Sequence, residues 1–370
     1  MNDLIAIFLI SGIAFLSPFI AERIRIPAVI LEILFGMILA SLYNIFGLSW
    51  FEFFALLGLI FLMFLSGLEI NFSILEKRKD IVFVSLLYIL LSFLISCLAV
   101  VMLKVHIIYA IFLTNVSLGL VVPVLREKRL AGTDFGQSIL VTTFLTDFLT
   151  MTLLSIIVIY EKYESVSMEF FLSFGIILLF FLSYFLGERL IWRFPNFFKR
   201  LYEDPMEVGV RGAFALMIFF SGVATLLGSE AILGAFLAGV LVSAVLRGSG
   251  TLGGKLEAVG YGVFIPIFFL KAGAELYRSL SGVNLIFVIY LTIAAFAVKL
   301  LPSFVFFKKF EVRDAIKIGT IQVSKLSLTV AGAEIARSAG VITSFEAANV
   351  IFFTLLTGLI APTIFRVMVK

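Results

Sequence analysis

The sequence predicts an all-α polytopic membrane protein of about thirteen transmembrane helices, built as an inverted repeat with two crossing discontinuous helices. Of the 370 residues, 62% are hydrophobic and only 14% are charged, and the mean hydropathy is +1.18. A soluble domain could not bury so much apolar surface. The composition therefore excludes a soluble enzyme, and we expect no enzymatic activity.

Thirteen apolar runs are long enough to cross a hydrocarbon core of roughly 30 Å. They cover residues 4–20, 26–48, 51–68, 81–103, 107–125, 136–160, 168–191, 211–227, 231–247, 257–275, 283–307, 315–335 and 346–366. The first run lacks the basic leading region and the small-residue cleavage site of a signal peptide. We therefore interpret it as the first span.

Lys and Arg are concentrated at alternate connections between these runs. About 21 of the 28 basic residues lie in or near the connections after spans 1, 3, 5, 7, 9 and 11 or at the C-terminus. The opposite connections contain four, namely Lys104, Lys162, Arg278 and Arg337. By the positive-inside rule, this predicts a multi-pass protein of the cell membrane with its N-terminus outside and its C-terminus in the cytoplasm.

The longest connection, residues 192–210, separates spans 1–6 from spans 8–13 and leaves span 7 as a linker. Because seven spans separate equivalent positions, the two halves have opposite orientations, as in many secondary transporters. No connection is long enough to form a soluble domain. We therefore expect any regulatory domain to be a separate subunit.

Spans 5 and 12 occupy equivalent positions in the two halves, and both are unusually polar. The polar and helix-breaking residues are Thr114, Asn115, Ser117, Gly119 and Pro123 in span 5, and Gly319, Thr320, Gln322, Ser324, Lys325, Ser327 and Thr329 in span 12. Such paired interruptions predict broken helices whose free carbonyls and helix ends can hold an ion. The alternative is that the hydroxyls bond back to their own helices and the glycines only permit tight packing.

Asp147 lies within span 6, in the stretch TTFLTDFLTM. An ionisable group near the bilayer midplane costs at least ~2.5 kcal/mol, so a function or a partner is expected for it. The structural alternative is an ion pair with Lys299 or Lys325 that locks helices together. The desolvation cost of two buried charges makes such a pair a poor device for stability alone, which favours a functional carboxylate.

Four further apolar stretches are informative because of the order in which they follow one another along the chain. They are IPAVILEILFGMILA (26–40), FLMFLSGLEINFSIL (61–75), LGAFLAGVLVS (233–243) and IPIFFLKAGAEL (265–276). Together they resemble the membrane domain of bacterial cation/proton antiporters of the sodium/hydrogen exchanger superfamily. The resemblance covers nearly the whole chain, and it implies a homodimer in which a six-helix core moves against a dimerisation panel.

Carried onto this chain, the resemblance implies five segments. Residues 1–80 hold the panel helices of the first repeat, 81–160 its core helices, 161–210 a linker helix and loop, 211–282 the panel helices of the second repeat, and 283–370 its core helices.

The resemblance also assigns the candidate site. Span 6 of the family carries Asp-Asp or Asn-Asp, with the second residue binding the ion, whereas this chain has Thr146-Asp147. Asp147 thus matches the essential carboxylate, and Thr146 supplies only a hydroxyl. Lys299 resembles a lysine that pairs with the missing aspartate, so Asp147 or a broken-helix carbonyl must be its partner here. Lys325 stands where many members have arginine or another polar residue, and Lys271 has no counterpart.

These features predict a secondary-active antiporter that exchanges a monovalent cation for H+ by alternating access, with Na+ the first choice and K+ the second. Asp147 would bind cation or proton, Thr114, Asn115, Ser117 and Thr146 would complete an oxygen shell, and Lys299 and Lys325 would compensate charge. A cation channel and an anion transporter are the rival interpretations. Beyond the transported ions no cofactor is expected, and the expected partners are a second copy, membrane lipids and a separate regulatory subunit, but no nucleic acid.

Overall fold

The structure is a computed structural model. It describes residues 3–24, 26–43, 48–68, 79–130, 132–163, 207–227, 231–246, 250–278 and 280–369, with a few isolated positions between 175 and 189. All regular secondary structure in these ranges is helical. Eight of the described helices are long and apolar enough to cross a membrane, and two shorter apolar helices accompany them. The chain is a multi-pass membrane protein.

Twelve of the thirteen predicted spans have helical counterparts in the described part of the chain. Ten of them are α1 (Asp3–Ile24), α2 (Ala28–Leu42), α3 (Ser49–Leu68), α5 (Lys79–Leu103), α8 (Asp134–Tyr163), α12 (Val208–Leu226), α13 (Ala231–Leu246), α14 (Gly250–Val259) continued through a π-turn into α15 (Ile265–Arg278), α16 (Leu285–Leu300) continued by the 3₁₀ helix η3 (Leu301–Lys308), and α19 (Ser344–Met368). A short 3₁₀ turn, η2, covers Leu280–Gly282. Most of predicted span 7 and of the connection after it lies outside the described residues, so the count of thirteen stays a prediction.

The other two spans are broken, as the sequence predicts. Span 5 divides into α6 (Ile108–Thr114) and α7 (Leu118–Glu127), and span 12 divides into α17 (Val312–Ile321) and α18 (Ser327–Ser338). The amide of Ser117 donates to the carbonyl of Ser324 at 2.8 Å, so the two breaks meet. The predicted all-α membrane fold with two crossing discontinuous helices is confirmed.

The chain forms two compact units. The first contains residues 1–15, 42–74 and 159–271, and the second contains residues 16–41, 75–158 and 272–370. Compactness alone does not define which helices move together, so the division into panel and core helices stays a prediction.

In the first unit, α3 and α13 pack at very short range. A Cβ atom at Gly239 of α13 would collide with the carbonyl of Phe64, and one at Gly67 of α3 would collide with the carbonyl of Phe236. Small residues allow such close approach of membrane helices, which associate through packing rather than through the hydrophobic effect. The glycines therefore determine the α3–α13 contact.

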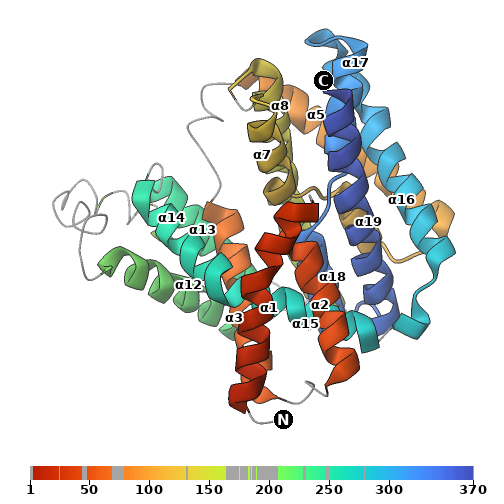
Figure 1. The fold of residues 1–370 in the computed structure, drawn as a ribbon. Coiled ribbons are helices and arrows are strands. Elements are labelled where there is room, and N and C mark those ends of the chain that lie inside the picture. The colour runs from red at the N-terminus through yellow and green to blue at the C-terminus, as the bar shows by residue number, and fades with distance from the viewer. Residues whose placement is uncertain are drawn as a thin grey trace. The chain divides into compact units, whose positions relative to one another are not determined.

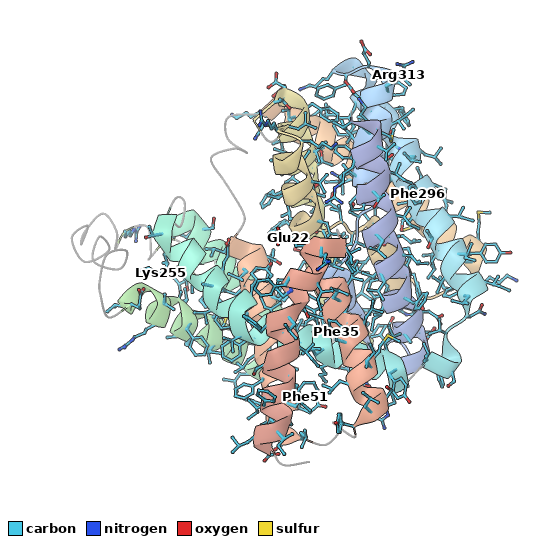
Figure 2. The ribbon with its side chains drawn as sticks, viewed as in Figure 1. Glu22, Phe35, Phe51, Lys255, Phe296 and Arg313 are labelled. Atoms are coloured by element: carbon cyan, nitrogen blue, oxygen red, sulfur yellow. The ribbon has the colours of Figure 1, made fainter. Side chains whose placement is uncertain are left out.

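The second unit has a core formed by α5, α7, α8, η3, α17 and α19. Its fully buried members include Tyr88, Val121, Ile139, Phe306, Ile318 and Phe365. Figure 1 shows α16 and α19 side by side in this unit, in agreement with their many contacts. Figure 2 shows apolar side chains such as Phe296 along α16, whereas the exposed Arg313 lies at the start of α17. This core therefore includes one half of each broken helix, α7 and α17.

Candidate functional site

The side chain of Asn115, in the break between α6 and α7, forms hydrogen bonds to α8 and α18. Its side-chain oxygen accepts hydrogen bonds from its neighbour's amide, Val116 N, at 2.7 Å and from the hydroxyl of Thr150 on α8 at 3.2 Å. Its side-chain nitrogen donates to the hydroxyl of Thr329 on α18 at 3.1 Å. A single buried amide thus bonds α8 and α18 to the break between α6 and α7, and satisfies an amide that the break would leave orphaned.

The carbonyls at the C-terminal end of α6 are bound by two lysines. Lys325 Nζ donates to Leu113 O at 2.9 Å and to Asn115 O at 2.5 Å, and Lys299 Nζ donates to Thr114 O. Both lysines are completely buried. A broken helix leaves its last carbonyls without amide partners, and its C-terminal end carries partial negative charge, so ammonium groups are suited to this position.

The carbonyl of Thr114 is therefore a hydrogen-bond partner of Lys299. The sequence left two possible partners for this lysine, Asp147 and a carbonyl of a broken helix, and Thr114 provides the second. The carboxylate of Asp147 also attracts the ammonium groups of both Lys299 and Lys325. The carboxylate on α8, the negative end of α6 and the two buried lysine side chains consequently share one region.

Asp147 and Thr146 differ in their surroundings. Asp147 is partly exposed, whereas the side chain of Thr146 is fully buried and donates to Thr142 O of its own helix at 2.7 Å. Thr150, one turn beyond Thr146, donates to Thr146 O and also to Asn115. The bond from Thr150 to Asn115 attaches the face of α8 that carries Asp147 to the crossing.

Thr114 and Ser117 differ from Thr146 in having buried hydroxyl oxygens without a hydrogen-bond partner in the described part of the chain. The same is true of the Ser324 hydroxyl and the side-chain oxygen of Gln322. Buried polar atoms are nearly always satisfied, so this cluster of oxygens at the two breaks is suited to a bound water or cation. The residues that the sequence nominated, with Lys299 and Lys325, thus meet at one place.

Three further residues belong to this site. The amide nitrogen of Gln322 donates to Thr143 Oγ1 at 2.9 Å and to Ile139 O at 3.3 Å, which attaches the α17 break to α8. Thr150 shares the face of α8 with Thr146, and this spacing of four residues could have identified it. Tyr88 contacts Lys299 from α5, but nothing in that apolar stretch distinguishes it.

Lys271 does not belong to the crossing. It lies on α15 in the first unit and forms an ion pair with Glu52 of α3 at 2.8 Å. The intramembrane lysine without a family counterpart therefore has a partner within its own unit.

The fold and the site together define a polytopic secondary transporter, because two broken helices cross beside a carboxylate within a membrane-spanning helix. Residues 11–370 match the family described as sodium/hydrogen exchanger, transmembrane. The chain belongs to the sodium/hydrogen exchanger family.

Three known proteins are similar to this chain. YjbQ of Bacillus subtilis is 30% identical over 97% of this chain, which spans 62% of the length of YjbQ. A Na+/H+ antiporter of Enterococcus hirae is 29% identical over 95% of this chain and 94% of that protein. The solved structure of the sodium proton antiporter MjNhaP1 from Methanocaldococcus jannaschii matches with a TM-score of 0.62 and 17% identity, over 98% of this chain and 96% of that one. This last likeness concerns the fold alone.

Proposed function

We propose that this protein is a secondary-active antiporter that exchanges a monovalent cation for H+ by alternating access, with Na+ as the first choice of cation and K+ as the second. The observation that carries the proposal is a partly exposed carboxylate, Asp147, in the middle of the helix whose Thr150 bonds to the crossing of two broken helices. Membership of the sodium/hydrogen exchanger family supports the same function.

In the proposed cycle, proton and cation compete for Asp147. The hydroxyls of Thr114 and Ser117 and the side chain of Asn115 provide neutral oxygens for a partly dehydrated cation, and Thr146 contributes an acceptor lone pair. Lys299 and Lys325 offset the negative end of α6, so that Asp147 remains the group whose charge changes. Neutralisation of Asp147 by either ligand lowers the cost of moving the site past an apolar barrier.

We extend the proposal to the assembly. The protein would act as a homodimer in the cell membrane, with its N-terminus outside and its C-terminus cytoplasmic. The panel helices would form the dimer contact, and the core helices would move against them. The uneven distribution of Lys and Arg supports the orientation. Membrane lipids and a separate regulatory subunit complete the proposed partners.

The test is transport by the purified protein in proteoliposomes. An acid-inside pH gradient is followed with a quenched fluorescent dye, and Na+, K+ and Li+ are added in parallel. We expect Na+ to dissipate the gradient most strongly, with no dissipation by choline and none by Asp147→Asn. Dissipation by choline salts would indicate an anion carrier, and proton-independent cation leak along its own gradient would indicate a channel.

A further inference from the structure

Tyr88 of α5 contacts Lys299 in two ways. Its hydroxyl donates to the carbonyl of Lys299 at 3.0 Å, and its ring centroid lies 5.8 Å from the Lys299 ammonium nitrogen. Tyr88 is fully buried, and its ring packs on Phe306 of η3 with centroids 5.5 Å apart. One side chain from a different helix therefore contacts both the main chain and the charged group of Lys299.

The main chain at Lys299 accepts a hydrogen bond from outside its own helix. Helix α16 ends at Leu300 and continues as η3, an eight-residue 3₁₀ helix. In a 3₁₀ helix the carbonyl of Lys299 would accept from the amide of residue 302, but this residue is Pro302, which has no amide hydrogen. The hydroxyl of Tyr88 supplies a hydrogen bond in its place. Runs of 3₁₀ helix longer than three or four residues are uncommon, so this junction depends on contacts such as this one.

The junction determines where the Lys299 ammonium lies. Its hydrogen-bond acceptor is the carbonyl of Thr114 on α6, and the ring of Tyr88 faces it from α5. The other charged groups that act on it are Asp147 from α8, which attracts it, and Lys325 from the α17–α18 break, which repels it. The ammonium thus has two competing negative neighbours, the end of α6 and the carboxylate of Asp147.

We propose that Tyr88 is a positioning residue that holds the Lys299 ammonium on the Thr114 carbonyl and so keeps Asp147 available to the transported cation. This inference rests on the proposed function and adds a residue that tunes its cation affinity. Without the Tyr88 hydroxyl, the Lys299 carbonyl loses this hydrogen bond and the lysine spends more time at Asp147. A lysine at the carboxylate competes with the cation, so cation affinity falls.

The first test compares two buried tyrosines of the second unit. Tyr88→Phe keeps the ring and removes the bond to Lys299, whereas Tyr109→Phe removes a hydroxyl that has no hydrogen-bond partner in the described part of the chain. We expect Tyr88→Phe to raise the apparent KM for Na+ about fivefold, which corresponds to about 1 kcal/mol, with the maximal rate per molecule unchanged. Tyr109→Phe should keep the wild-type KM. A wild-type KM in Tyr88→Phe overturns the inference.

The second test asks whether Tyr88 acts through Lys299. Na+ binding to purified protein is measured from Na+-dependent thermal stabilisation, which requires no transport. In a Lys299→Met background, Tyr88→Phe should cause no further loss of Na+ affinity, because residues that act through one another are not additive. An equal fold-loss in both backgrounds refutes the positioning role. If the wild-type protein itself shows neither Na+-driven proton movement nor Na+-dependent stabilisation, the proposed function fails and this inference fails with it.

Discussion

Asp147 is the side chain on which the proposed exchange depends. Asp147→Asn removes the titrating charge at nearly constant volume, so we expect exchange to fall to the level of empty vesicles while the protein still folds and purifies normally. Asp134→Asn, at the exposed start of the same helix, is the matched control and should retain exchange. Proteoliposome flux with Na+ is the measurement. Cation-dependent proton flux in a well-folded Asp147→Asn protein would show that the site lies elsewhere.

Ser117 and Asn115 allow the roles of ligand and scaffold to be separated. Ser117→Ala removes a hydroxyl that makes no hydrogen bond within the described residues, so we expect an apparent KM for Na+ raised about fivefold, at unchanged thermal stability. Asn115→Ala should also raise the KM, but it removes the side-chain hydrogen bonds to the Val116 amide and the Thr329 hydroxyl and should cost about 1–3 kcal/mol of stability. Wild-type cation dependence in both variants would exclude these oxygens from the site.

At the scale of helices, the α3–α13 pair of the first unit depends on the absence of side chains. Gly239→Ala would place a Cβ against the carbonyl of Phe64, whereas the space around Gly222 on α12 is open. We expect Gly239→Ala to destabilise the protein by about 1–3 kcal/mol. Gly222→Ala should be neutral or stabilising by up to ~1 kcal/mol, because alanine favours the helix. Melting temperatures in detergent decide between these outcomes, and equal melting temperatures would contradict the packing argument.

For the whole molecule, we expect electroneutral exchange of one cation for one proton. Thr146 cannot carry the second negative charge of a double-aspartate site, so Asp147 is the carboxylate available for competition between proton and cation. Lys299 would make the exchange electrogenic only if it released a proton in each cycle, and its bond to the Thr114 carbonyl at the negative end of α6 favours the charged form.

Reversal potentials measure this stoichiometry. With Na+ as substrate and the membrane potential clamped by K+ and valinomycin, the Na+ gradient at which net proton flux vanishes is determined at several voltages. A null point independent of voltage is expected. A null point that shifts with voltage would make Lys299 the first residue to replace.

The membrane spans, the two breaks and the central carboxylate are predictable because each is a local consequence of the bilayer. Twenty apolar residues span it, an unpaired backbone must be buried or line a cavity, and an ionisable side chain within a span is expensive. Asp147, Asn115 and Ser117 are visible in the sequence for this reason. The resemblance to the sodium/hydrogen exchanger superfamily is confirmed by the match over residues 11–370.

The partners of these residues could be found only in the tertiary structure. Lys299 lies 185 residues from Thr114 in the sequence, and Lys325 lies 212 residues from Leu113, so no local pattern pairs them. Tyr88 is separated from Lys299 by 211 residues and sits in a predominantly apolar helix. The sequence by itself determined which groups must be buried in the membrane, because the cost of burial belongs to each group. Packing decided which carbonyl or hydroxyl satisfies each of them, because that depends on how distant helices meet.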